Sequence, residues 1–169
     1  SPNINSLETA LVYPGTCLIE STNISEGRGT QFPFLQIGAP FFNSEDIILK
    51  LNLLAVEGAE IQPTTFIPED IENMATDAKF EGKTCYGIKI KITDPNKFES
   101  VKIGVKLLFV LTKLYGSKIK FNESSFDRLA GSDVLRHQLK NQLLPDKIFA
   151  TWQKDLTKFN KKINQYLIY

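Results

Sequence analysis

The feature that most constrains the fold is the segment 85–93, in which apolar and polar residues alternate. Tyr86, Ile88, Ile90 and Ile92 take turns with Gly87, Lys89, Lys91 and Thr93. Successive side chains of a strand point to opposite faces of its sheet, so the pattern predicts a strand with one buried face and one solvated face. The fold must therefore contain a sheet that packs on one side.

Helical patterns account for much of the remaining chain. Asn43 or Ser44 is suited to cap a helix that runs to about Val56, and the segment 101–115 predicts a second helix that ends at Gly116. The last third predicts helices over 126–131, after Ser132, and from Pro145 onward. The last of these has an apolar face, and its lysines lie on the opposite, solvated side.

Other segments predict shorter strands and irregular structure. The apolar residues 10–13 and 17–19 suggest a strand that is interrupted at Pro14-Gly15. Residues 60–84 are expected to be largely irregular, with a short strand at Phe66-Ile67, and residues 118–121 suggest an edge strand. The aromatic residues between 32 and 42 are expected to cover the core, and a platform for sugar rings is the alternative.

Strands and helices alternate here without a repeated βαβ unit, which predicts an α+β fold. We expect one domain over residues 1–169, with a small mixed sheet covered by helices and a helical C-terminal third.

Composition excludes several classes of protein. Apolar residues make up 42% of the chain and charged residues 23%, and the net charge is +1. These values are typical of a globular domain and provide no basic surface for nucleic acid. We expect no membrane span, because no apolar run approaches about 18 residues.

The residues that most often bind metals are scarce. The chain has two cysteines, Cys17 and Cys85, and one histidine, His137. We expect neither a metal site nor a cofactor, and we expect His137 to be solvated. Buried thiols are favoured for the cysteines, although a Cys17–Cys85 disulfide remains open.

A polar loop follows the first apolar segment and carries the candidate site: Glu20, Asn23, Glu26 and Arg28. Gly27 and Gly29 flank the arginine and allow φ > 0 and a close approach to another surface, so that Arg28 can be aimed outward. The structural alternative is that Arg28 pairs with Glu20 or Glu26 and only holds the turn together. From these residues alone the two interpretations are about equally supported.

The same loop carries a resemblance to a known family, the NamZ-type exo-β-N-acetylmuramidases. Near the start of the chain the matching residues are 11–18, Glu20, 22–23, 25–30, 33–34 and 37–40. Further matches are 85–94, Phe98, Gly104, 126–127, 129–131, 135–136, Trp152, 155–156, Phe159 and 166–169. The resemblance extends over essentially the whole chain, but it corresponds only to the C-terminal part of the family's proteins.

The resemblance implies an activity and an arrangement of domains. The family hydrolyses the β-1,4 bond that releases N-acetylmuramic acid from the non-reducing end of peptidoglycan fragments. Its principal catalytic glutamates belong to an N-terminal Rossmann-like domain that this chain lacks, and its cleft lies between the two domains. We therefore expect no catalytic residue in this fragment, which should be inactive alone, and a periplasmic or extracellular location.

Within that resemblance, Glu20, Asn23, Glu26 and Arg28 are expected to line the cleft. N-Acetylmuramic acid bears a lactyl carboxylate that a guanidinium could bind through two hydrogen bonds. Two rival hypotheses remain. One is a non-catalytic module that recognises muropeptides, and the other is a self-sufficient hydrolase with Glu20 and Glu26 as its carboxyl pair.

Overall fold

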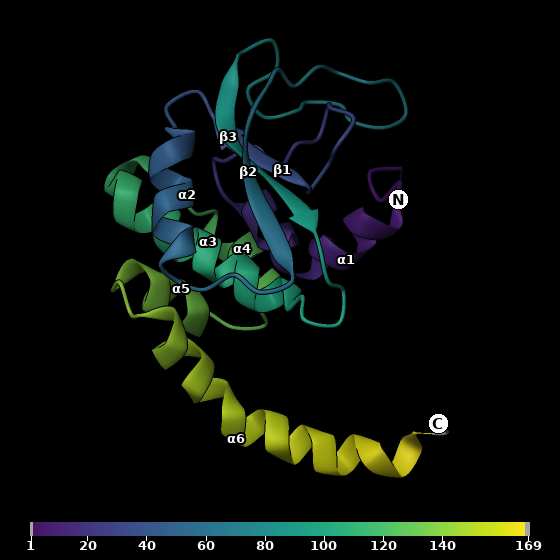
Figure 1. Ribbon diagram of the computed structural model, residues 1–169, viewed down its shortest axis with the longest axis vertical. Coiled ribbons are helices and arrows are strands. Elements are labelled where there is room, and N and C mark those ends of the chain that lie inside the picture. Colours follow the sequence, from purple (N-terminus) through teal and green to yellow (C-terminus); the bar gives the residue numbers. More distant parts are fainter. Residues whose placement is uncertain (1, 168–169) are drawn as a thin grey trace.

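The structure is a computed structural model that describes residues 2–167 (Figure 1). Ile168 and Tyr169, which carry part of the resemblance noted above, lie outside the described residues. The strands are β1 (Gln36–Ala39), β2 (Ala59–Phe66) and β3 (Cys85–Ile92). The α-helices are α1 (Leu7–Thr16), α2 (Ser44–Asn52), α3 (Ser100–Tyr115), α4 (Glu123–Ala130), α5 (Val134–Lys140) and α6 (Pro145–Ile163). Three short 3₁₀ helices join them: η1 (Cys17–Ser21), η2 (Gly116–Lys118) and η3 (Asn164–Tyr166).

The predicted strand lies at the centre of the sheet. The strand order is β1-β3-β2, and both neighbours of β3 are antiparallel to it. Ile88 and Ile90 of β3 are each 1% exposed and belong to the core. The α+β class is therefore confirmed, and among the described residues the sheet is antiparallel throughout rather than mixed.

The predicted strand at residues 10–13 is wrong, because this segment is part of helix α1. The Ser6 side chain caps the helix by accepting a hydrogen bond from the Thr9 backbone N–H (3.0 Å), and Glu8 lies in the first turn. Pro14 stands inside α1, where its missing N–H and ring normally interrupt a helix. The residues 17–19, also predicted as strand, belong to the 3₁₀ helix η1.

Helix α3 provides the contact that accommodates Pro14. The Ser100 hydroxyl donates to the Val12 carbonyl (2.7 Å), which also accepts from the Thr16 hydroxyl (3.1 Å), and it accepts from the Gly15 N–H (2.9 Å). Gly15 and Gly104 allow the two backbones to approach closely, since a Cβ added at Gly104 would lie 2.4 Å from the Gly15 oxygen. The proline and glycine that suggest a turn in the sequence thus form a helix crossing.

Strand β2 is longer than the short strand that the sequence predicts at Phe66-Ile67. It spans eight residues, includes Pro63, and pairs with β3 along its whole length. Proline is tolerated there because β2 is an edge strand. The strand predicted at 118–121 is reduced to an isolated bridge between Thr22 and Phe121.

The remaining predicted helices are confirmed with shifted ends. Asn43 caps α2, which ends at Asn52 rather than near Val56, and Gly116 follows α3. Helices α4, α5 and α6 form the helical last third. In Figure 1, α6 leaves the body after its first turns, and its distal part stands apart from the other elements.

Several smaller expectations can also be compared with the structure. Cys17 and Cys85 are free thiols, the first partly buried and the second buried. Phe34 is fully buried and Phe42 is 7% exposed, so these rings do cover the core, whereas Phe32 is 39% exposed. The His137 side chain is exposed, as expected. Between residues 2 and 167 no helix is long and apolar enough to cross a membrane.

Candidate functional site

Two of the candidate residues, Glu20 and Glu26, form ion pairs with a third, Arg28. Its Nη2 donates to Glu20 Oε2 at 3.1 Å, and its Nε lies 3.2 Å from Glu26 Oε1. The Arg28 and Glu20 side chains are about one-third and one-quarter exposed, at 31% and 27%, whereas the Glu26 side chain is 6% exposed. One guanidinium therefore joins a buried and a half-buried carboxylate at the protein surface.

The two glycines have the conformations that the sequence predicts. Gly27 and Gly29 have φ values of 79° and 76°. A Cβ at Gly27 would lie 2.6 Å from the Gln36 oxygen, and one at Gly29 would lie 2.4 Å from the Glu69 oxygen. Both positions thus require glycine for conformation and for close approach, and the turn that carries Arg28 is held rigidly.

Lys79 completes the cluster, and sequence reasoning did not identify it. Its Nζ donates to Glu26 Oε2 (2.9 Å) and to three backbone carbonyl oxygens, those of Ile19 (3.2 Å), Glu20 (2.9 Å) and Ile24 (3.0 Å). An ammonium with carboxylate and carbonyl acceptors can be buried without loss of its hydrogen bonds. Lys79 lies in an irregular loop 53 residues from Glu26 and carries no motif, so only the fold reveals it.

Two aromatic residues, Phe34 and Tyr13, lie next to the cluster. The Arg28 guanidinium carbon lies 5.0 Å from the centre of the Phe34 ring, and Phe34 contacts Tyr13 edge to face at 4.9 Å. Burial raises the pKa of Tyr13, and the Glu20 carboxylate raises it further. Cation–π contact and charge pairing thus fix the guanidinium from two sides. Neither ring was predicted to lie at the site.

The side chain of Asn23, the fourth candidate, hydrogen-bonds to the backbone of a neighbouring segment. Its side-chain amide donates to the Lys118 oxygen (2.9 Å), and its carbonyl accepts from the Lys120 N–H (2.7 Å). Both polar ends of the side chain are therefore engaged by the backbone. We interpret Asn23 as the residue that anchors this loop to residues 118–120.

The geometry bears directly on two of the hypotheses made from the sequence. Both ion pairs expected of a structural staple are present. Glu26 is buried and paired with two cations, which argues against Glu20 and Glu26 as an independent pair of catalytic carboxyl groups. Arg28 Nη1 has no hydrogen-bond partner among the described residues, and neither has the buried Oε1 of Glu20. The cluster therefore retains the N–H groups of Nη1 for another molecule or domain, whereas the buried Oε1 of Glu20 is enclosed by the domain itself.

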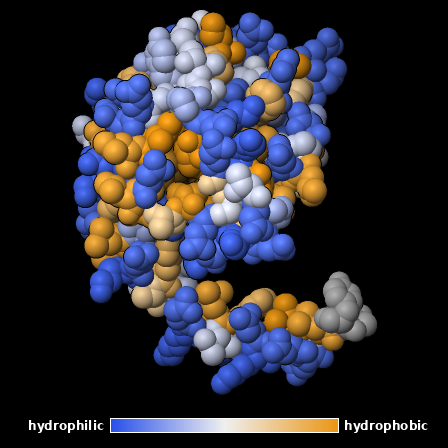
Figure 2. Space-filling model, viewed as in Figure 1, coloured by the Kyte–Doolittle hydropathy of each residue, from blue (hydrophilic) through white to orange (hydrophobic). Residues whose placement is uncertain are grey.

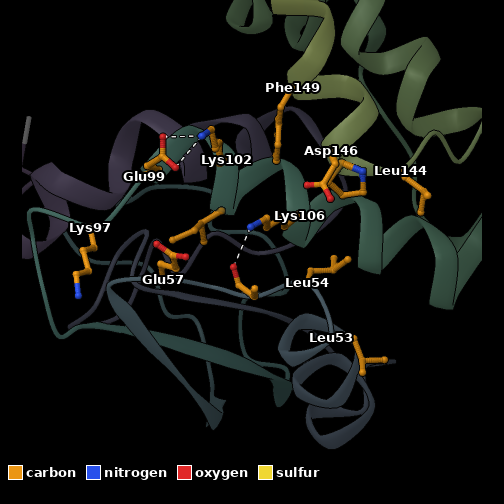
Figure 3. A pocket seen from close by; sticks show the side chains of 13 residues that line it. Leu53, Leu54, Glu57, Lys97, Glu99, Lys102, Lys106, Leu144, Asp146 and Phe149 are labelled. Atoms are coloured by element: carbon orange, nitrogen blue, oxygen red, sulfur yellow. Dashed lines mark hydrogen bonds and ion pairs between the residues drawn. The ribbon is translucent and has the colours of Figure 1, made fainter. Parts of the chain in front are cut away.

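The cluster is partly exposed and does not line the larger cavities among the described residues. Four cavities in the described structure are lined by other residues, and none includes Glu20, Asn23, Glu26 or Arg28. A cavity of about 470 Å³ lies between the end of α2, α3 and the start of α6 (Figure 3). In this cavity Lys102 is paired with Glu99 at 2.8 Å and Lys106 donates to the Ala55 oxygen, so its main cations are already satisfied.

Asp127, which the resemblance also includes, has a structural role. It accepts two hydrogen bonds of 2.8 Å from the nearly buried Arg136, which joins α4 to α5. These bonds hold the pKa of Asp127 below its usual value. Among residues 2–167 no group of three or more His, Cys, Asp or Glu could hold a metal ion.

Comparison with known proteins places the chain among proteins of one family. Residues 11–169 match the family model described as "Exo-beta-N-acetylmuramidase NamZ, C-terminal". The whole chain is 39% identical to the peptidoglycan beta-N-acetylmuramidase NamZ of Bacillus subtilis and covers 39% of that protein. The chain thus spans about two-fifths of the length of this curated relative.

Two solved structures have the same fold. A DUF1343 family protein from Bacteroides fragilis superimposes with a TM-score of 0.87 at 22% identity, over 100% of this chain and 44% of that one. A second DUF1343 protein from the same organism gives 0.69 at 24% identity and is covered over 43% of its length. At these identities the likeness shows the fold alone.

Proposed function

Because this chain belongs to the NamZ exo-β-N-acetylmuramidase family as its C-terminal domain, we propose that it forms one wall of a cleft in which peptidoglycan fragments are hydrolysed. The opposite wall is an upstream domain of the same polypeptide, which supplies the catalytic carboxyl groups. The reaction releases N-acetylmuramic acid from a non-reducing end. Such a substrate places the complete protein in the periplasm or outside the cell.

One observation carries the proposal: a partly exposed guanidinium that two carboxylates hold in place still has N–H groups without a partner among the described residues. Arg28 is held by Glu20 and Glu26, and its Nη1 has no partner among residues 2–167. A charge that is already positioned loses little conformational entropy when it binds a carboxylate. Arg28 is therefore suited to bind the lactyl carboxylate of N-acetylmuramic acid, in a cleft that closes only when the upstream domain is present.

Glu20 has a positioning role in this proposal. Its Oε2 accepts a hydrogen bond from Arg28, and its Oε1 is enclosed by the domain itself, so the sugar does not reach it. Glu26 and Lys79 hold Glu20 and Arg28 in place.

The proposal is tested by release of a chromophore from a β-linked N-acetylmuramic acid glycoside. The 169-residue chain is compared with the complete protein that includes the upstream domain. We expect turnover only in the complete protein, because Glu20 and Glu26, the carboxyl pair considered from the sequence, are tied to Arg28 and Lys79. Turnover by the 169-residue chain would contradict the division of labour between the domains.

A second measurement separates this proposal from a non-catalytic recognition module. Such a module would bind muropeptides as the isolated chain, and the complete protein would lose affinity but not turnover rate when Arg28 is replaced. In the proposed cleft, Arg28 also orients the sugar, so its loss lowers kcat as well.

A further inference from the structure

The distal part of α6 presents an apolar stripe that no other described element covers. Leu156 and Phe159 are 45% and 57% exposed and follow Trp152 at helical spacing, and Tyr166 of the adjoining η3 is 68% exposed. Figure 2 shows apolar side chains gathered along one side of this projecting helix and hydrophilic ones along the other. An amphipathic helix of this kind normally obtains its stability by packing its apolar face.

The body of the domain carries a matching apolar wall. Val101, Leu129 and Val134 are 43%, 41% and 53% exposed, although each belongs to a regular helix. Together with α6 they line a groove of about 640 Å³. Asp155 is the only charged residue among those that line it. Depletion of charge is typical of the centre of a buried interface.

Helix α6 does not fill this groove itself. Its buried residues are Pro145, Ile148 and Phe149, all in the first turns, and Trp152 is the last to pack partly on the core. Beyond that point the two apolar walls face a common space without closing it. Exposed apolar surfaces of this extent mark interaction sites.

The length of the relatives identifies the occupant. The family match is to the C-terminal part of its proteins, and about three-fifths of the Bacillus subtilis relative lies outside the match. A domain of that size has to pack against this one, and the groove is an uncharged apolar surface, apart from Asp155, on which it can do so.

We propose that the groove between distal α6 and helices α3, α4 and α5 is the docking surface for the upstream domain of the same polypeptide. This inference rests on the two-domain arrangement of the proposed function. Phe159 and Leu156 are the central contacts. Helix α6 then acts as an arm against which the upstream domain packs.

Photo-cross-linking in the complete protein tests the docking surface directly. A benzophenone amino acid is placed at Phe159, and a matched probe is placed at the exposed Lys161, on the opposite side of the same helix. We expect the Phe159 probe to form intramolecular cross-links to upstream residues, with a yield at least about tenfold above that of the Lys161 probe. Peptide mass spectrometry identifies the residues that are joined.

Every other pattern of cross-links would overturn the proposal. Cross-linked dimers would show that a second copy fills the groove, and links only to residues 129–135 would show that α6 folds back on its own domain. Equal yields from the two probes would show that the face is unoccupied. The readout does not involve hydrolysis, so a protein without muramidase activity could still confirm the docking, and an active one could refute it.

A pair of substitutions gives an independent check. Leu156→Ser with Phe159→Ser leaves the domain core intact, since both side chains are exposed in it, but removes apolar contacts from the interface. We expect the rate of proteolytic cleavage between the two domains to rise by about tenfold or more. Lys154→Ser with Lys161→Ser, on the opposite face of the helix, should leave it unchanged. The same rate in both double variants would contradict the proposal.

Discussion

At the scale of single residues, the candidate site is a cluster of four charged side chains joined by ion pairs. Glu20 and Glu26 are balanced by Arg28 and Lys79, so the cluster is neutral overall. Lys79 is bound to backbone carbonyls and to the buried carboxylate, which gives it a positioning role. Arg28 alone combines a fixed position with an uncommitted donor, and it is the residue whose loss should change recognition.

Replacing Arg28 by alanine in the complete protein should weaken muramic-acid substrates more than glucosamine analogues. Loss of a charged hydrogen bond to the lactyl group lowers kcat/KM by about tenfold to a hundredfold for the former. Folding should persist, because Lys79 still neutralises Glu26. Steady-state kinetics on the paired substrates measure the effect, with the exposed Arg128→Ala as control. An equal loss on both substrates would refute the carboxylate contact.

The pair formed by Asp127 and Arg136 leads to an expectation about pH. Because hydrogen bonds from Arg136 lower the pKa of Asp127, the native state binds fewer protons than the unfolded state. The stabilisation is complete above the usual aspartate pKa of about 3.9 and is lost as pH falls through the lower native value.

Urea unfolding between pH 2 and 7 tests this expectation. Asp127→Asn should lower the free energy of unfolding at neutral pH, and the difference from the parent chain should shrink below pH 4. Asp133→Asn is the control, because its side chain is exposed and its pair with His137 is long, at 3.6 Å. A difference between the parent chain and Asp127→Asn that stays constant over this range would contradict the assignment.

At the scale of elements, the crossing of α1 and α3 determines the position of the site. Helix α1 leads directly into η1 and Glu20, and its Pro14 is accommodated because Ser100 of α3 bonds to the backbone around it. The contact between Gly15 and Gly104 places the two helices at backbone distance. A change at this crossing should therefore disturb the domain far more than the loss of a small side chain would suggest.

Gly104→Ala should lower the free energy of unfolding by about 3 kcal/mol, at the upper end for overpacked sites. Its Cβ would lie 2.4 Å from the Gly15 oxygen, and backbone cannot move aside as a flexible side chain can. Gly131→Ala is the matched control, since nothing lies within 4 Å of an added Cβ and the left-handed helical backbone costs an alanine about 1 kcal/mol. Denaturant titration of both variants measures the difference; similar losses would contradict the tight crossing.

At the scale of the whole molecule, two surfaces are suited to contact the same upstream domain. Arg28 is partly exposed and has N–H groups without a partner among the described residues, and the groove beside α6 is apolar and unfilled. The chain covers 39% to 44% of the relative and of the two solved proteins it matches. One upstream domain that contacts both surfaces would bury the groove and complete the site, so the cross-linking and hydrolysis experiments examine two sides of a single arrangement.

Local sequence patterns predicted the elements whose signals do not depend on distant contacts. The alternation in β3, the Asn43 cap of α2 and the glycine after α3 all lie within a few residues of the structure they specify. The conformations of Gly27 and Gly29 were predicted for the same reason. Membership of the family was likewise recognised from the loop motif, since aligned residues need no fold to be compared.

Contacts between distant residues decided the rest. Residues 10–13 are helical because Ser100 satisfies the backbone around Pro14, and Pro63 enters a strand because β2 has an outer edge. Lys79 joins the site from 53 residues away. By itself, the sequence determined the α+β class and the polar loop with Arg28, because these depend on local periodicity and backbone freedom. Only the tertiary structure decided which charges meet and which apolar faces stay uncovered, because burial and pairing are set by neighbours in space.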